Sequence, residues 1–118
     1  LFRSGSVRFI DGPTVGSRVR ATVEVTRPTG LPWPTAAPGG DPRGRVRLGV
    51  TVEGARCGCV LLDGRADIGR WIPGDVGRFT VDVDLALEDA DDQDLTVTVQ
   101  LLREGVGRFG DPAVVEVG

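Results

Sequence analysis

The stretch that decides the fold is residues 17–26, SRVRATVEVT, in which apolar and polar side chains alternate without a break. In an extended chain, Val19, Ala21, Val23 and Val25 would point to one side and the residues between them to the other. Successive side chains of a β-strand alternate between the two faces of a sheet. The pattern therefore predicts a strand with one face on a core and the other in water.

The same alternation recurs along the chain. It is complete in three further stretches and shorter in three more, namely 45–53, 78–87 and 95–102, then 6–10, 57–62 and 113–117. No stretch repeats apolar residues at the period of a helix. Seven short strands separated by turn residues are typical of a sandwich. We therefore predict an all-β fold, an immunoglobulin-like antiparallel β-sandwich of about seven to eight strands.

The length of 118 residues is that of one domain. We expect residues 1–118 to form a single sandwich domain cut from a longer protein, because the chain opens without an initiator Met. Residues 27–44 contain five Pro and four Gly and are predicted to form one long loop. Loops of this length are often functional. The sequence is compatible with two interpretations of this segment, a flexible surface loop and a binding loop.

The side-chain inventory argues against an enzyme. The chain has no His, Lys, Tyr, Met or Asn and only three Ser. These residues carry most nucleophilic and general-base chemistry. The absence of Lys and Asn beside abundant Ala, Gly, Val, Arg and Asp indicates a GC-rich genome, whose codon usage accounts for part of this bias but not for the missing His. We therefore predict a binding or structural module without a cofactor.

Charge is unevenly distributed along the chain. Residues 1–59 hold nine Arg and four acids (+5), and residues 60–118 hold five Arg and thirteen acids (−8), which together give the net charge of −3. We expect cross-strand pairs between arginine and acidic side chains on solvent faces. The basic half lacks interleaved aromatic residues, so no nucleic-acid partner is predicted. No apolar run approaches the length of a membrane span.

Three groups of residues invite a chemical interpretation and do not sustain it. Cys57 and Cys59 are two residues apart, and a disulfide between residues so close in sequence is strained, so we expect two free, buried thiols. Free thiols favour a reducing compartment such as the cytoplasm, but they do not assign the localisation. Without His, they do not complete a zinc site. The acidic run 88–94 departs from a calcium-binding loop at its sixth and twelfth positions, so no metal is predicted. Asp63 and Asp67 flank what reads as a turn. Paired carboxylates can hydrolyse glycosides, but no partner residue positions these two, so no catalytic role is predicted for them.

Two tryptophans and three arginines are the better candidates for binding. Trp33 stands between two prolines in the long loop, as a stiff apolar side chain that suits stacking on a sugar ring or docking on a protein. The alternative is that Trp33 folds back and caps the sandwich. Trp71 precedes a predicted strand, where packing against the core is the alternative. Arg45, Arg47 and Arg108 could hydrogen-bond hydroxyls or carboxylates through their planar forks.

Residues 101–109, LLREGVGRF, resemble an "LVQEGVxWF" element of β-sandwich modules attached to bacterial glycosyltransferases. The same modules carry a "PGE … YxLxV" lead-in, which residues 73–75 and the strand from Phe79 resemble. A related group is the C-terminal O-antigen-binding domain of ABC-transporter ATPases that export polysaccharide. The chain departs from these relatives at Arg108, where they often have Trp, and at Phe79, where they have Tyr. For Glu104 we expect a structural role at the turn beside Gly105.

The resemblance implies an immunoglobulin-like sandwich that recognises a glycan. We therefore predict a non-catalytic glycan-binding or accessory module of a carbohydrate-processing or polysaccharide-export protein. Its expected partner is a polysaccharide or oligosaccharide, held by Trp33, Trp71, Arg45, Arg47 and Arg108. The alternative is a structural module that binds a protein or associates with itself through its sheet edges.

Overall fold

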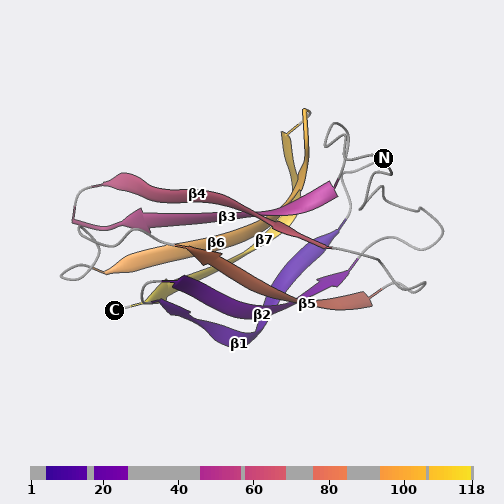
Figure 1. Ribbon diagram of the computed structural model, residues 1–118, viewed down its shortest axis with the longest axis horizontal. Coiled ribbons are helices and arrows are strands. Elements are labelled where there is room, and N and C mark those ends of the chain that lie inside the picture. The colour runs from indigo at the N-terminus through magenta and orange to yellow at the C-terminus, as the bar shows by residue number, and fades with distance from the viewer. Residues whose placement is uncertain are drawn as a thin grey trace.

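The computed structural model describes residues 5–15, 18–26, 46–56, 58–68, 76–84, 94–105 and 107–117. These residues form seven strands (Figure 1): β1 (Ser6–Val15), β2 (Arg18–Thr26), β3 (Val46–Gly54), β4 (Cys59–Asp67), β5 (Val76–Asp84), β6 (Leu95–Arg103) and β7 (Gly107–Val117). They contain no helix, so the predicted all-β fold is confirmed. The predicted loop at 27–44 lies outside the described residues.

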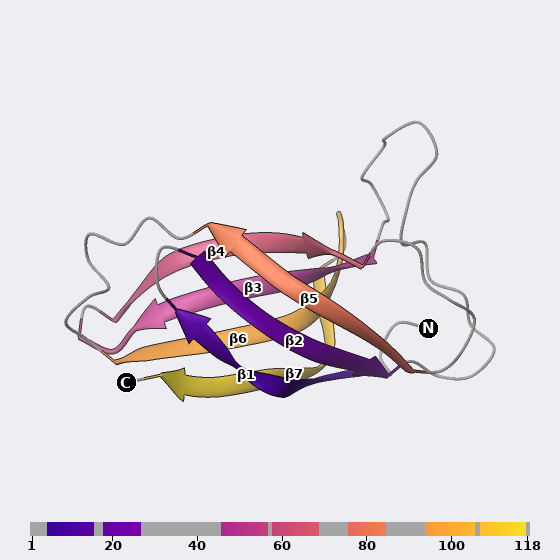
Figure 2. The same cartoon turned by 60° about the horizontal axis from the view of Figure 1, so that its bottom comes forward.

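The strands form one curled sheet in the order β4-β3-β6-β7-β1-β2-β5. Because the sheet folds over, β1, β2 and β5 lie as one layer across a second layer of β4, β3, β6 and β7 (Figure 2). The two edge strands, β4 and β5, contact each other. All neighbouring pairs are antiparallel except β1 and β7, which pair in parallel at Ser6 and Asp111. This one parallel pair is a departure from the antiparallel pairing that the sequence predicts.

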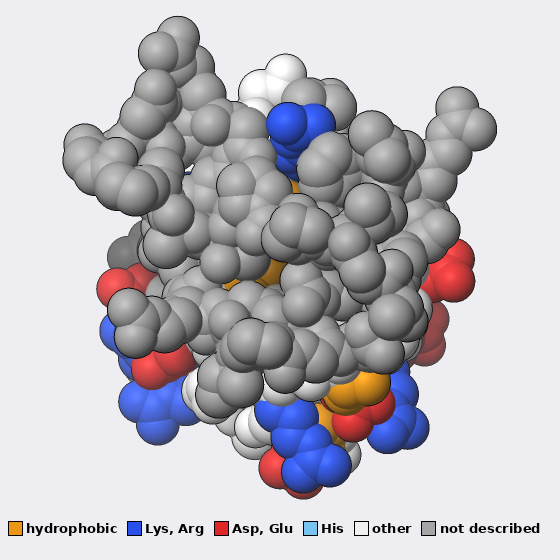
Figure 3. Space-filling view, turned by 90° about the vertical axis from the view of Figure 1, so that its right-hand side faces the viewer, with side chains coloured by type: hydrophobic (Ala, Val, Ile, Leu, Met, Phe, Trp, Pro, Cys, Tyr) orange, Lys and Arg blue, Asp and Glu red, His pale blue; other side chains and the backbone are white. Residues whose placement is uncertain are grey.

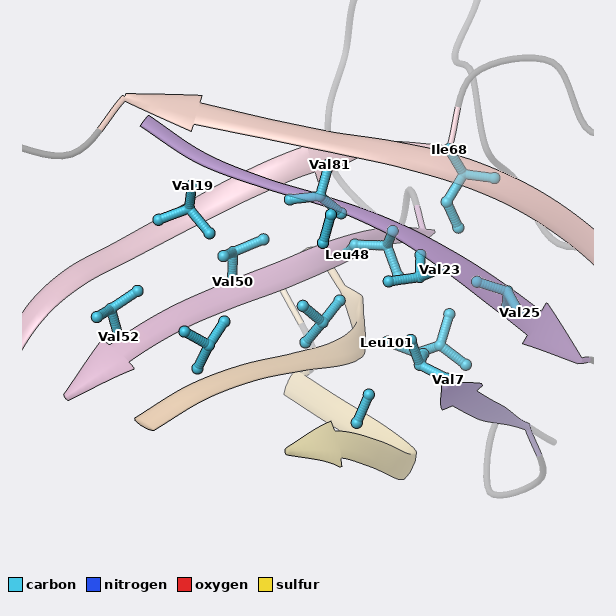
Figure 4. Packing of buried hydrophobic residues seen from close by; sticks show 14 of the residues in the cluster. Val7, Val19, Val23, Val25, Leu48, Val50, Val52, Ile68, Val81 and Leu101 are labelled. Atoms are coloured by element: carbon cyan, nitrogen blue, oxygen red, sulfur yellow. The ribbon is translucent and has the colours of Figure 1, made fainter. Parts of the chain in front are cut away.

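The core lies between the two layers and consists of the alternating apolar positions (Figure 4). Its buried members are Val7, Val19, Ala21, Val23, Val25, Val46, Leu48, Val50, Val52, Ile68, Val81, Leu95, Val97, Val99, Leu101 and Ala113. Most are valines, whose branched side chains suit the pleated surface of a strand. Burial of this apolar surface is the main force that holds the layers together.

Strand β4 is longer than predicted. Asp63 and Asp67, which were predicted to flank a turn, lie within it and pair with Thr51 and Arg47 of β3. Gly64 between them faces β5, where an added Cβ would lie 2.8 Å from Cγ1 of Val83. The glycine is therefore present because β5 packs too closely for a side chain, and not because the chain turns.

The prediction of two free, buried thiols is wrong for Cys59, which is exposed and disulfide-bonded. The only other cysteine, Cys57, lies outside the described residues. The prediction treated 57–62 as one extended strand. Instead, Gly58 has a φ of 61° and donates its N–H to the carbonyl of Gly54 at 2.9 Å, so β4 begins only at Cys59. The argument from free thiols for a reducing compartment therefore no longer applies.

A bulge in β7 joins the two layers. From the pair Val99–Ala113 to the pair Leu101–Phe109, β6 spans two positions whereas β7 spans four. The bulge therefore contains two extra residues of β7. Within the bulge, the N–H of Asp111 donates to the carbonyl of Gly5 at 3.0 Å, beside the parallel pairing of β1 with β7. Beyond it, the β6–β7 hairpin turns sharply away from the rest of these strands (Figure 1).

Gly110 makes this bulge possible. Its φ of 74° is left-handed, and a Cβ at this position would lie 2.7 Å from the carbonyl oxygen of Gly5. Other residues rarely adopt this conformation, and a backbone atom cannot easily move aside. The sequence therefore needs glycine here for two independent reasons.

We expect Gly110→Ala to lower the free energy of unfolding by about 1–3 kcal/mol, the usual cost of a left-handed non-glycine residue, before any clash with Gly5 is counted. Urea denaturation measures the loss. The matched control is Gly12→Ala in β1, where an added Cβ has no atom within 4 Å. Equal stability of the two variants would show that the bulge does not constrain the fold.

Candidate functional site

The candidate site lies on the outer face of the β4-β3-β6-β7 layer, opposite the core. On β3 the residues that face outward are Arg47, Gly49 and Thr51, which alternate with buried apolar neighbours. Their partners on β4 are Asp67, Arg65 and Asp63, and Arg47 also pairs with Leu102 of β6. Leu102 in turn pairs with Arg108 of β7. The pairing thus brings charged residues from three strands and the β6–β7 hairpin to one end of the face.

Arg108 lies across this face. Its guanidinium lies over Gly49, where an added Cβ would be in ordinary van der Waals contact with the guanidinium carbon at 3.8 Å and with Nη2 at 3.9 Å. Nη2 donates hydrogen bonds to Oγ1 of Thr51 at 2.8 Å and to Oδ1 of Asp63 at 3.2 Å. Thr51 is the buried polar residue among those described, with 8% of its surface exposed. On an outward-facing position, this burial fits the arginine that covers it.

The contacts continue from Asp63 through two further arginines. Nη1 of Arg65 donates to the same Oδ1 of Asp63 at 2.8 Å, and its Nε lies 3.5 Å from Oε1 of Glu104. Oε1 of Glu104 also accepts from Nη1 of Arg47 at 3.4 Å. We call Arg47, Thr51, Asp63, Arg65, Glu104 and Arg108 the outer-face network. It contains three cations and two anions.

Asp63 is held in its charged form. The hydrogen bond from Arg65 is the main cause that lowers the pKa of its carboxyl, and the charges of Arg65 and Arg108 lower it further. A carboxyl that stays ionised is a steady hydrogen-bond acceptor. It is not a proton donor at neutral pH, which is the role of a general acid.

The structure brings together two of the five predicted binding residues. Arg47 and Arg108 lie on one face and belong to the same network. Arg45, Trp33 and Trp71 lie outside the described residues. The sequence reasoning missed Thr51 and Arg65 and assigned no binding role to Asp63. Had β4 been predicted through residue 67, the alternation within β3 and within β4 would have placed all three on the outward faces of their strands.

Among the described residues, Glu104 pairs with arginine side chains and not, as the sequence predicts, with the backbone of the turn. The sequence interpretation made it an acceptor for the turn at Gly105. In the structure its carboxylate lies between the guanidinium groups of Arg47 and Arg65. It therefore links β3 to β4 from the turn at the end of β6.

The outer face of the other layer carries cross-strand ion pairs. Arg18 pairs with Asp82, with 2.5 Å between Nε and Oδ1, and also with Asp84, and Arg8 donates to Glu24 at 2.9 Å. The predicted pairing of arginines with acidic residues is confirmed for these residues. Side chains of both signs are interspersed at the end of the molecule shown in Figure 3. Through Arg18, strand pairing thus joins a basic side chain from the first half of the sequence to two acidic side chains from the second.

Comparison with protein family models, with curated proteins and with solved structures finds no match. Within the described ranges, no three His, Cys, Asp or Glu side chains gather in a way that could hold a metal ion. The same residues include no helix able to span a membrane. The assignment of a function therefore depends on the geometry of the outer-face network and on the sequence itself.

We expect the pKa of Asp63 to lie below 3.8, its ordinary value, and to rise toward that value in Arg65→Gln. A carboxyl whose pKa is lowered by folding stabilises the folded state at pH values above its pKa in the unfolded chain. This contribution is lost as the pH falls through its pKa in the folded state. Carbon-13 NMR of the carboxyl group between pH 2 and pH 6 measures both values. Arg78→Gln, which removes a neighbour of Glu24 instead, is the control. An unchanged pKa in Arg65→Gln would contradict the assigned pairing.

Proposed function

We propose that this chain is a non-catalytic glycan-binding module with an immunoglobulin-like sandwich. The single observation that carries the proposal is the position of Arg108. It belongs to the 101–109 element through which the sequence resembles glycan-recognising modules, and its guanidinium lies in a polar network on an open sheet face. Pairing of β1-β2-β5 in one layer and β4-β3-β6-β7 in the other supports the immunoglobulin-like assignment.

The network offers the groups that hold a sugar. Sugar hydroxyls both donate and accept hydrogen bonds, and the face presents guanidinium donors beside the carboxylate acceptor of Asp63. Oδ1 of Asp63 is engaged by Arg65 and Arg108, whereas its Oδ2 accepts no hydrogen bond from the described residues. Donors and acceptors at fixed positions on a rigid sheet favour binding with little loss of entropy. Because the network carboxylates are paired with arginines, it suits holding a ligand more than cleaving it.

A second candidate function is protein interaction or self-association through the sheet edges. The observation in its favour is apolar exposure on the edge strands. Val60 on β4 and Val76 on β5 are 57% and 52% exposed. Edge strands with exposed apolar side chains can pair with another chain. A stable dimer by light scattering, together with no binding to any glycan, would favour this candidate.

We expect the wild-type protein to bind at least one polysaccharide on an array of neutral and acidic bacterial polysaccharides. Arg108→Gln should weaken that binding about tenfold or more, because a hydrogen bond from a charged donor contributes about 1.5–3 kcal/mol. The matched control is Arg78→Gln, an arginine of β5 in the other layer. Titration calorimetry with the best polysaccharide measures the affinities, and melting temperatures show that each variant is folded.

Two results would contradict the proposal. One is a folded wild-type protein that binds no polysaccharide on the array at millimolar sugar. The other is equal loss of affinity in Arg108→Gln and Arg78→Gln, which would place the binding surface elsewhere.

A further inference from the structure

Two guanidinium groups are held side by side by one oxygen atom. Oδ1 of Asp63 accepts from Nη1 of Arg65 at 2.8 Å and from Nη2 of Arg108 at 3.2 Å. Like charges this close repel each other, so each guanidinium is stabilised by a nearby anion. Asp63 serves both arginines, and Arg65 also has the carboxylate of Glu104 at 3.5 Å. Among the described residues, Arg108 therefore has no carboxylate partner that it does not share, and its guanidinium is held at a fixed place on the sheet face.

Both arginines retain unused donors. Among the described residues, Nε and Nη1 of Arg108 have no hydrogen-bond partner, and neither has Nη2 of Arg65. The two side chains are 34% and 30% exposed, so they remain open to solvent while their positions are fixed by Thr51, Asp63 and Glu104. A planar guanidinium with free N–H groups is the geometry that binds a carboxylate.

The other layer has a similar composition but lacks this arrangement. Arg8 and Arg78 also share one carboxylate, that of Glu24, but they are 73% and 72% exposed. Side chains so exposed are screened by water and lose more entropy when a ligand fixes them. Arg18 has two carboxylate partners, Asp82 and Asp84, and it shares Asp82 with Arg20, whose side chain is 64% exposed. Compared with these arginines of the other layer, both side chains of the Arg65–Arg108 pair are more buried.

We propose that the ligand of the outer-face network is an acidic polysaccharide whose sugar carboxylates bind between Arg65 and Arg108. This inference rests on the proposed glycan-binding function and specifies the class of glycan. The ligand carboxylate accepts hydrogen bonds from the unused donors of both arginines and gives Arg108 an anionic partner that it does not share with Arg65. A hydroxyl of the same sugar donates to Oδ2 of Asp63, which orients the ring on the face.

The test compares two polymers that differ in one group. Polygalacturonate carries a carboxylate on every sugar, and its carboxyl-reduced form carries a neutral hydroxymethyl group instead. We expect the wild-type protein to bind polygalacturonate at least about tenfold more tightly than the reduced polymer, and the difference to shrink between 20 mM and 500 mM NaCl, because salt screens exposed charges. Titration calorimetry measures each affinity.

Four variants locate the effect. Arg108→Gln and Arg65→Gln should each remove most of the preference for the acidic polymer, whereas Arg78→Gln should keep it. Arg108→Lys keeps the charge but not the planar fork, so it should retain part of the preference. The melting temperature shows whether each variant is folded. If Arg108→Gln does not fold, Arg108→Lys still tests the role of Arg108.

Equal affinity of the wild-type protein for the two polymers would overturn this inference and leave the proposed glycan-binding function standing. A preference for polygalacturonate that Arg108→Gln and Arg65→Gln keep would also overturn it, because the carboxylates would then bind elsewhere. Binding to neither polymer overturns the inference as well. The polysaccharide array then decides whether glycan binding itself fails.

Discussion

The close approach of Gly110 to Gly5 is the constraint on which much of this structure depends. At this point β7 leaves its register with β6, adopts a left-handed conformation and passes within van der Waals distance of the chain that leads into β1. The N–H of Asp111 then bonds to the carbonyl of Gly5, and Nε2 of Gln100 donates to the carbonyl of Gly110 at 2.9 Å. These bonds satisfy backbone groups that the bulge would otherwise leave without partners. The Asp111–Gly5 bond also joins the two layers on one side of the sandwich, while on the other side the edge strands β4 and β5 contact each other without pairing.

The bulge also sets the position of the site. Continuing the register of Val99 with Ala113 would have placed Arg108 opposite residue 104, at the end of the hairpin. The two extra residues in β7 place it opposite Leu102 of β6, which in turn pairs with Arg47 of β3. From there the side chain reaches over Gly49 to Thr51 and Asp63. A backbone irregularity that joins the layers thus also aims the arginine that we assign to ligand binding.

Much of the fold could be predicted from the sequence because valine-rich alternation is unbroken in the central strands. Val46, Leu48, Val50 and Val52 of β3 are all fully buried, as the period of two requires. The prediction fell short where glycine interrupts the pattern. It ended β4 before Gly64 and began β7 only after Gly110, because a glycine in a sequence indicates a turn as readily as a close packing contact.

The candidate site was predictable to a smaller extent for the same reason. Arg47 stands in a strand with clear alternation, and Arg108 in an element with a resemblance to known modules, so both could be singled out. Arg65 and Asp63 could not, since their strand was predicted to end at residue 62. A network that crosses three strands depends on the pairing of residues far apart in the chain, and a single sequence does not contain that information. For Arg45, Trp33 and Trp71, binding roles stay predictions.

The central claim is that the face carrying Arg108 is the surface that holds a ligand. Amide chemical-shift mapping by NMR, with oligomers of whichever polysaccharide the protein binds, tests it most directly. We predict that the largest shifts fall on Gly49, Thr51, Asp63, Arg65 and Arg108, with β1, β2 and β5 little changed. Shifts confined to the β1-β2-β5 layer would contradict the account.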